Sequence, residues 1–384
     1  MPQTSAAPQQ RPPSATAAPS GATAIAEDPG DRSRGAQRTA VGSGRASGSE
    51  FAPLLRTVKE QGLLAYRKGW YARVIAVNLL CLAGVVAGMV ALGGSWWVLL
   101  LAPVLAVLSA RTAFIGHDAG HAQITADRRT SRIIQLVHGN VLLGMSQEWW
   151  NDKHNRHHAN PNHIDKDPDV VADVLVFTQK QAVGRIGFRR WLTRHQALLF
   201  FPLTTLEGIA LKVYGFQSVF DPNGPGRSVR ARVVEGLLLA VHVLGYAALL
   251  LTAMPVGQAL VFGLVHQMLF GLHLGMAFAP NHKGMEMVDA ETGKGWGHLR
   301  RQVLTSRNIR GGRVTDWLLG GLNYQVEHHL FPSMPRPHLR LAQPLVRAHC
   351  RRLSLPYVET GLVESYRQAL AHMREVGEPL RPGA

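Results

Sequence analysis

Four long apolar runs constrain the fold of this chain more than any other feature. They cover about residues 74–92, 96–112, 233–252 and 256–279. Each approaches the ~20 residues that an α-helix needs to cross a bilayer core. Only the tripeptides GGS and AMP separate the members of each pair, so the runs predict two hairpins of spanning helices. Trp96 and Trp97 open the second run, and such aromatic side chains favour a membrane–water interface.

The charged residues predict the orientation of these hairpins. The chain carries 41 Lys and Arg against 25 Asp and Glu, a net charge of +16. Neither hairpin tip is charged, whereas the opposite flanks of all four runs are rich in Lys and Arg. Because basic flanks stay on the cytoplasmic side, we expect both termini and all sizeable polar segments to be cytoplasmic. The basic excess then reflects orientation, and the sequence predicts no nucleic-acid partner.

The remaining segments predict the domain organisation. Residues 1–50 consist largely of Ala, Pro, Ser, Gly, Gln and Arg, so we expect a disordered tail. Residues 51–384 are expected to form one all-α integral membrane domain, in which a cytosolic helical cap covers residues 113–232 and 280–384. Residues 180–214 mix arginines with large apolar side chains, which predicts an interfacial amphipathic helix.

Histidine is unusually frequent, with 18 residues, and seven of them gather in three motifs. The motifs are HDAGH (117–121), HNRHH (154–158) and QVEHH (325–329), and each places its polar side chains three or four residues apart. On a helix, this spacing puts the imidazoles on one face. One further histidine directly follows the fourth apolar run. By the predicted topology, all eight lie at the cytoplasmic face: His117, His121, His154, His157, His158, His282, His328 and His329.

Eight imidazoles on one face indicate a metal centre. A single zinc site uses four ligands, so eight histidines suit two ions with about four nitrogen ligands each. Imidazole binds iron, copper, zinc and nickel, and two iron ions with positions left for oxygen fit best. Cys81 and Cys350 are the only cysteines, too few for a thiolate site. His266 and His273, seven residues apart in the fourth run, offer an alternative haem site.

At these residues the sequence resembles the membrane fatty acid desaturase family, over residues 70–350. The segments HNRHHANPNHIDKDPD and GLNYQVEHHLFP stand in the family's order and spacing. Gln325, where many acyl-CoA desaturases have His, resembles the acyl-lipid and front-end subgroup, and the composition resembles actinobacterial members. The resemblance implies that the eight histidines ligate a di-iron centre in a bacterial cytoplasmic membrane. It also implies O2 as co-substrate and an external electron donor such as ferredoxin with its reductase.

Several polar residues lie beside the motifs and are expected to contact the centre through water or to orient its ligands. They are Gln325, Asp118, Asp167, Asn281 and Asn323, with Asp165, Asp169 and Glu327 as further partners for imidazoles. Three arginines, Arg307, Arg310 and Arg313, are expected at the cytosolic surface. There they would meet an acidic electron carrier, lipid headgroups or coenzyme A phosphates.

The expected reaction is oxygen-dependent introduction of a double bond into a fatty acyl chain, carried by coenzyme A or by a lipid. Aliphatic C–H bonds resist side-chain acids and bases, so a metal–oxygen reagent is needed. Two other functions fit the same residues. One is a di-iron membrane hydroxylase or monooxygenase acting on an alkyl or carotenoid substrate. The other is a non-catalytic membrane haem or metal-binding protein, which needs ligands near the middle of the spans.

Overall fold

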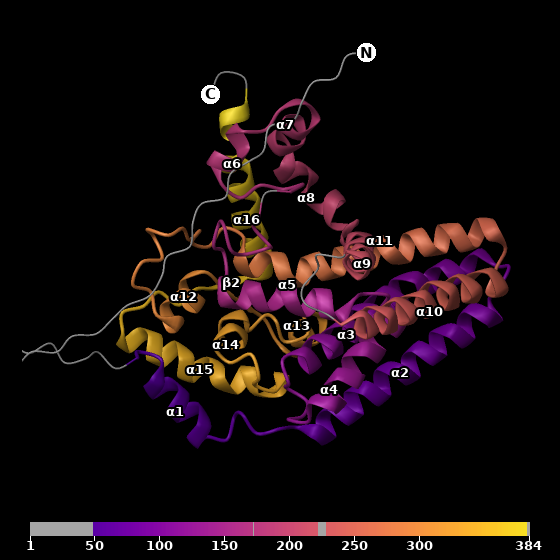
Figure 1. Cartoon of the computed structure of the whole chain (residues 1–384), viewed down its shortest axis with the longest axis horizontal. Helices are drawn as coiled ribbons and strands as arrows, with labels where there is room; N and C mark the ends of the chain where they lie inside the picture. The colour runs from indigo at the N-terminus through magenta and orange to yellow at the C-terminus, as the bar shows by residue number, and fades with distance from the viewer. Residues whose placement is uncertain (1–48, 172, 222–227, 382–384) are drawn as a thin grey trace, which may run out of the picture. The chain divides into compact units, whose positions relative to one another are not determined.

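The computed structural model describes residues 49–171, 173–221 and 228–381. The expected disordered tail, residues 1–50, lies outside the described residues except for its last two. Within the described residues, the secondary structure is helical apart from two short strands and one isolated bridge. The strands β1 (Asn308–Arg310) and β2 (Glu359–Gly361) pair in parallel. The all-α prediction is therefore confirmed (Figure 1).

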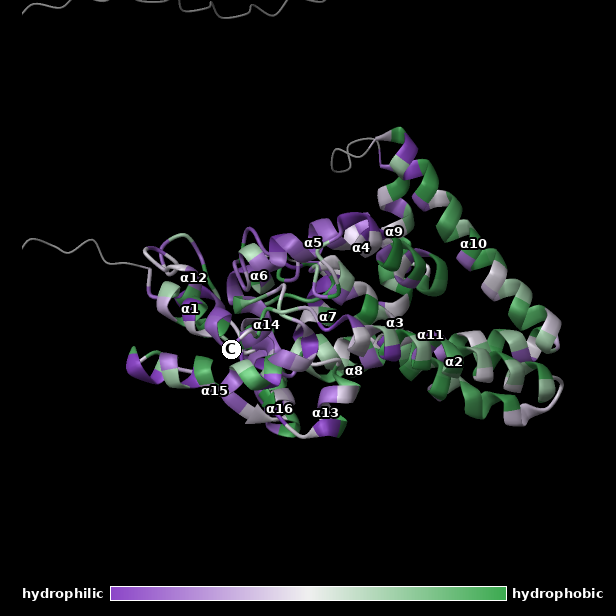
Figure 2. Ribbon diagram, turned by 90° about the horizontal axis from the view of Figure 1, so that it is seen from below, coloured by the Kyte–Doolittle hydropathy of each residue, from purple (hydrophilic) through white to green (hydrophobic). Residues whose placement is uncertain are grey.

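Four helices of the described residues are long and apolar enough to cross a membrane, as predicted. They are α2 (Lys68–Ala91), η1 with α3 (Trp96–Leu100 and Leu101–Gly120), α10 (Val229–Ala253) and α11 (Val256–His282). They lie at the right of Figure 1 and are largely apolar in Figure 2, where α10 meets the others near the hairpin tips and diverges from them toward its start. Each helix extends beyond its apolar segment at the end opposite the hairpin tip. In the second span the helix continues eight residues past the predicted span end at residue 112, through most of the polar HDAGH motif to Gly120.

The two hairpin tips lie against each other. Gln258 Nε2 at the start of α11 donates to the carbonyl of Gly94, at 3.2 Å. A Cβ on Gly93 would lie 2.0 Å from the carbonyl oxygen of Ala253, so only glycine allows this approach. Behind the tips, Met89, Val98 and Phe262 join one buried apolar cluster. The neutral tips predicted from the sequence therefore meet at one end of the four helices.

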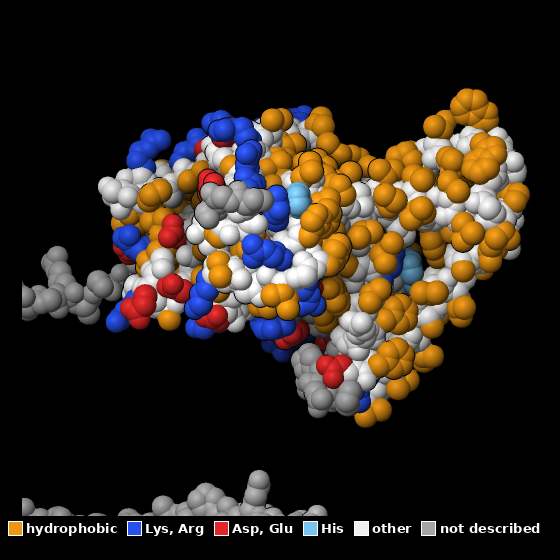
Figure 3. All heavy atoms as spheres, turned by 90° about the horizontal axis from the view of Figure 1, so that it is seen from above, with side chains coloured by type: hydrophobic (Ala, Val, Ile, Leu, Met, Phe, Trp, Pro, Cys, Tyr) orange, Lys and Arg blue, Asp and Glu red, His pale blue; other side chains and the backbone are white. Residues whose placement is uncertain are grey.

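The cap is built from shorter helices before, between and after the spans. They are α1 (Ala52–Glu60), α4 (Arg128–Gln135), η2 (Leu136–Val141), α5 (Gln147–Ala159), α12 (His298–Leu304), α13 (Arg313–Leu318), α14 (Gln325–Leu330), α15 (Arg336–Arg352), α16 (Leu362–Val376) and η3 (Glu378–Leu380). On the face drawn in Figure 3, Lys and Arg gather over the cap, and apolar side chains cover the end formed by the spans.

The predicted amphipathic helix over residues 180–214 was wrong, because the chain breaks there into four helices. They are α6 (Gln179–Val183), α7 (Gly187–Arg194), α8 (Gln196–Thr204) and α9 (Glu207–Phe220). Gly187, with φ +54°, begins α7, and α8 and α9 meet at 71° just after Pro202. Glycine and proline interrupt the helix at these points. Together α8 and α9 are apolar enough to form a broken span.

A buried carboxylate in α10 fixes the start of α5, the helix that carries HNRHH. Ser146 caps α5, and its hydroxyl donates to Glu235 Oε2 at 2.9 Å. Asn140 Nδ2 and the amide of Glu148 donate to Glu235 Oε1 at 3.1 and 3.2 Å. Because a buried carboxylate needs such donors, this network locks the cap onto the spans.

Candidate metal centre

The eight motif histidines come from four elements that converge at one end of the spans. His117 lies in the last turn of α3 and His121 caps this helix, while α5 carries the HNRHH histidines. His282 ends α11, and α14 carries His328 and His329. The structure brings all eight together, as two adjacent groups. The rings of His158 and His329 stack between the groups, with centroids 4.3 Å apart.

The first group contains five histidines whose ligand atoms lie within 4.8 Å of one another: His117, His121, His154, His158 and His328. At its centre, His154 Nε2 lies 2.9 Å from His121 Nε2 and 3.0 Å from His158 Nε2. A single ring proton cannot satisfy three converging nitrogens. A shared cation, by contrast, would accept the lone pairs of all of them.

The second group contains His157, His282 and His329 within the same 4.8 Å limit. The Nδ1 atom of each ring already has a partner. His157 Nδ1 contacts Asp167 Oδ2 at 2.9 Å, His282 Nδ1 the carbonyl of Thr305 at 3.0 Å, and His329 Nδ1 the Oε1 of Gln302 at 2.9 Å. These contacts orient the rings through Nδ1, so that each ring would bind an ion through Nε2, which is typical of metal-ligating histidines.

The donor set fits metal ions. Among the described buried side chains, five nitrogens of these histidines have no hydrogen-bond partner, including both ring nitrogens of His328 and the Nε2 of His117 and His329. Each unpartnered buried group costs about 1–3 kcal/mol, which a bound cation would offset. Burial and the neighbouring imidazoles hold the pKa of His154, His158 and His328 well below the ordinary value. These rings are therefore uncharged at neutral pH, as ligation requires.

Asp118 contacts the first group. Its Oδ1 lies 3.0 Å from His117 Nδ1, and its Oδ2 contacts Arg336 Nη2 at 2.5 Å. The hydroxyl of Tyr71 also donates to Asp118 Oδ2, at 3.0 Å. Arg336 and Tyr71 could not be identified as partners from the sequence, because both lie far from HDAGH along the chain.

Asp167 contacts a histidine of the second group, His157. It is fully buried and accepts hydrogen bonds from the amides of Asn162 and Asp169 at 2.8 and 2.9 Å, besides its contact with His157. Burial lowers the pKa of His157, but the Asp167 carboxylate outweighs burial, so the pKa is raised. Asp169 also approaches His157 Nδ1, at 3.4 Å, and pairs with Lys153, whereas Asp165 is exposed.

Gln325 touches the second group directly. Its side-chain Nε2 lies 2.9 Å from His282 Nε2, and its Oε1 accepts from Asn281 Nδ2 at 3.2 Å. Asn281 thus reaches the group through Gln325. The Nδ2 of Asn323 donates to Asp316 Oδ1 at 2.8 Å. Glu327 accepts from Asn308 and Tyr357 rather than from an imidazole, at 2.6 and 2.7 Å.

Two expectations about other basic and histidine residues are corrected. Arg307 is not a surface residue: its side chain is buried, and its Nε donates to the carbonyl of Pro280 at 2.7 Å, which anchors the end of α11. Arg310 and Arg313 are exposed. The two candidate haem ligands already have hydrogen-bond partners. His266 contacts Ser109 and Tyr246 at 3.1 and 2.7 Å, and His273 Nε2 bonds to the carbonyl of Leu318.

Four candidate spans and two largely buried histidine groups able to hold metal ions define the class, an integral membrane protein with a histidine-lined centre. The chain belongs to the fatty acid desaturase family, because the family model described as Fatty acid desaturase matches residues 94–361. It is similar to the Acyl-lipid (9-3)-desaturase of Physcomitrium patens, with 29% identity over 73% of this chain and 54% of the relative.

Two further relatives have related names. A Delta(6)-fatty-acid desaturase of Caenorhabditis elegans is 30% identical over 75% of this chain and 67% of its own length. Delta(8)-fatty-acid desaturase 2 of Arabidopsis thaliana is 30% identical over 72% of this chain and 63% of its own length. The chain thus spans about half to two thirds of the length of these relatives.

The side chain of Gln325 lies close enough to His282 to affect how tightly the three-histidine group binds a metal ion. Gln325→Ala removes the polar group beside the three-histidine group, and we expect its affinity for iron to fall about tenfold. Gln325→His supplies a fourth imidazole and is expected to bind at least as tightly as the natural protein. Anaerobic titration of the metal-free protein with Fe²⁺ measures both affinities. Unchanged affinity in Gln325→Ala would show that Gln325 has no part in binding.

Proposed function

We propose that this protein is a fatty acyl desaturase with two iron ions and O2 as co-substrate. The observation that supports this proposal is the pairing of a five-histidine group with an adjacent three-histidine group. The eight histidines of the sequence analysis would be the ligands, with Gln325 beside the second ion. When bound, two iron ions supply the oxygen-derived oxidant that C–H cleavage requires.

The protein's own residues would position and shield this chemistry. Asp118 and Asp167 hold one imidazole in each group, and Thr305 and Gln302 hold two more, so the ring orientations are set before any ion or substrate arrives. Six of the eight histidines are buried and the other two are half-buried, which would limit the access of bulk water to the reacting carbons. The electrons would come from an external donor such as ferredoxin with its reductase.

The substrate and orientation belong to the same proposal. The centre lies at the ends of α3 and α11, directly beyond the apolar spans, so an acyl chain in the bilayer would reach it without entering water. The names of the relatives favour an acyl-lipid substrate of the front-end type. The basic flanks favour a cytoplasmic centre and cytoplasmic termini in a bacterial membrane, with residues 51–384 as one desaturase domain.

Fatty acid profiling of an expressing host tests the reaction. A desaturase yields an acyl product two hydrogens lighter than its precursor, whereas a hydroxylase on the same scaffold yields a product one oxygen heavier. Gas chromatography with mass spectrometry and double-bond location separates these outcomes, and cells with an empty vector serve as the control. A product heavier by oxygen, without an unsaturated product, would replace the desaturase proposal with the hydroxylase alternative.

A further inference from the structure

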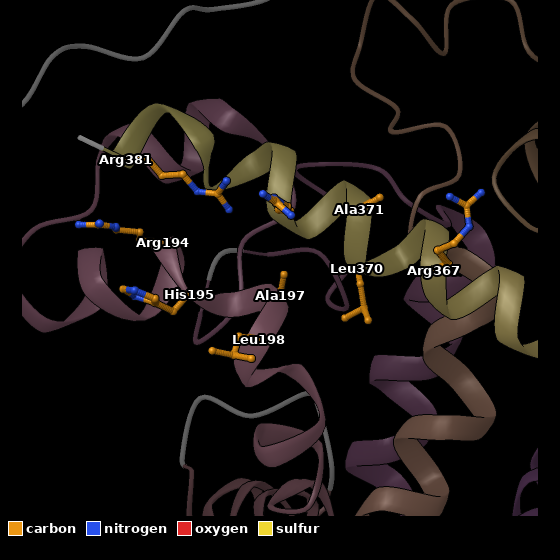
Figure 4. A pocket seen from close by; sticks show the side chains of 9 residues that line it. Arg194, His195, Ala197, Leu198, Arg367, Leu370, Ala371 and Arg381 are labelled. Carbon is orange, nitrogen blue, oxygen red and sulfur yellow. The ribbon is translucent and has the colours of Figure 1, made fainter. Parts of the chain in front are cut away.

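A basic pocket lies between α7, α8 and α16, apart from the elements that carry the histidine groups. Its volume is about 750 Å³, within the range typical of small-molecule sites. In Figure 4, the side chains of α7 and α8 and those of α16 and Arg381 lie on opposite sides of it. The lining residues that matter here are four arginines and two leucines: Arg194, Arg367, Arg374, Arg381, Leu198 and Leu370.

The positive charge of the pocket is only partly neutralised by the protein. Arg367 forms a bidentate ion pair with Glu364, in which Nε and Nη2 donate to the two carboxylate oxygens at 2.7 and 2.8 Å. Within the residues that the structure describes, no carboxylate forms an ion pair with Arg194, Arg374 or Arg381. Guanidinium groups around one cavity repel one another, and their planar donors match the oxygens of a phosphate. The pocket is therefore suited to a phosphate-bearing anion.

The surroundings of the pocket are apolar as well as basic. Leu198, at the pocket wall, is 78% exposed, and Ile186 and Phe188 at the start of α7 are 82% and 72% exposed. From the pocket, α8 continues through the 71° bend into α9, and this pair is apolar enough to enter a bilayer. Exposed apolar side chains beside arginines are typical of a surface at the membrane interface. A soluble acidic protein would leave these apolar groups in water.

We propose that this pocket binds the phosphodiester headgroup of an anionic membrane lipid. Arg194, Arg374 and Arg381 would contact the phosphate, and Leu198 and Leu370 would contact the glycerol and the first acyl carbons. α16 also packs on α11, where the hydroxyl of Tyr366 donates to the carbonyl of Met276 at 2.6 Å. A lipid in the pocket would therefore hold a cap helix against a spanning helix, whatever reaction the protein catalyses.

Lipid titration of the purified full chain in a non-ionic detergent tests the proposal. Native mass spectrometry counts the bound molecules of dioctanoyl phosphatidylglycerol, dioctanoyl phosphatidylcholine or coenzyme A. We expect one tight phosphatidylglycerol site, with at least tenfold weaker binding of phosphatidylcholine and of coenzyme A. The triple variant Arg194→Gln, Arg374→Gln, Arg381→Gln should lose at least tenfold in phosphatidylglycerol affinity, while its iron content stays unchanged.

A matched variant separates a built site from general attraction. Arg189→Gln, Arg190→Gln and Arg351→Gln together remove the same charge from exposed arginines outside the pocket, so phosphatidylglycerol affinity should change less than twofold. Equal losses in the two triple variants would mean diffuse attraction and overturn the proposal. Coenzyme A binding as tightly as phosphatidylglycerol would reassign the pocket to a nucleotide phosphate. An absence of tight lipid binding to the unaltered protein would remove the site altogether.

Discussion

His157→Ala is expected to abolish double-bond formation, by at least a hundredfold, and to lower the iron content from two ions per chain to about one. His157 is one of only three histidines in its group, so its removal leaves two imidazoles and Gln325 to hold an ion. The five-histidine group keeps all of its members and should retain its ion. Iron per chain is measured by inductively coupled plasma mass spectrometry, and activity by fatty acid profiling of the expressing host.

His163→Ala provides the control for this experiment. His163 follows the same helix α5 but lies outside both histidine groups, so the variant should keep both ions and its activity. Full activity in His157→Ala would contradict the di-iron proposal. Loss of both ions from His157→Ala would show instead that the two groups bind their ions cooperatively.

Asp167→Asn is expected to lower the affinity of the three-histidine group for iron by about 10- to 100-fold, the range found for carboxylates that orient metal-bound histidines. The amide has the shape of the carboxylate but only one accepting oxygen, so it cannot keep every hydrogen bond that Asp167 accepts. It loses the charge that favours a cation on His157, whose Nδ1 lies 2.9 Å from Asp167 Oδ2. Activity should fall because fewer molecules carry the second ion.

Iron content after dialysis against graded chelator concentrations measures this change. Asp165→Asn removes an exposed carboxylate from the same loop and should retain iron like the unaltered protein. Addition of excess Fe²⁺ should restore part of the activity of Asp167→Asn, whereas a variant that fails to fold would stay inactive. Equal iron retention in the two variants would show that Asp167 does not support the centre.

The spans and the gathering of the histidines could be predicted because both depend on local patterns. An apolar run of bilayer length forms a helix because its backbone groups must be hydrogen-bonded within the segment. A spacing of four residues puts His154 and His158 on one face of a helix. The short tips then bring HDAGH and His282 to the same end of the spans. Neither step requires knowledge of which cap helices contact each other.

The division of the eight histidines and the partners of their rings could not be predicted in this way. Gln302 in α12 contacts His329, and Thr305, in the segment that joins α12 to β1, contacts His282. That segment carries no periodic signal. The burial of Arg307 likewise depends on α16, which supplies Gln368 as a partner more than sixty residues further along the chain. Long-range packing of this kind leaves no mark within a short window of sequence.

The broken segment after residue 178 shows a different limit. Its composition indicated a basic and apolar surface, but the prediction of a single helix was wrong. Gly187 and Pro202 interrupt the helix. The break between α7 and α8, at His195, places Arg194 and Leu198 on one wall of the arginine-lined pocket.

The order of the histidines along the chain also sets when the centre can be completed during synthesis. The first two, in and after α3, leave the ribosome early, but His328 and His329 in α14 follow α11, the last of the candidate spans among the described residues. A nascent chain therefore inserts both hairpins while each histidine group still lacks a member. Any chain cut short before α14 would carry six of the eight imidazoles, so only a nearly finished polypeptide offers both complete groups.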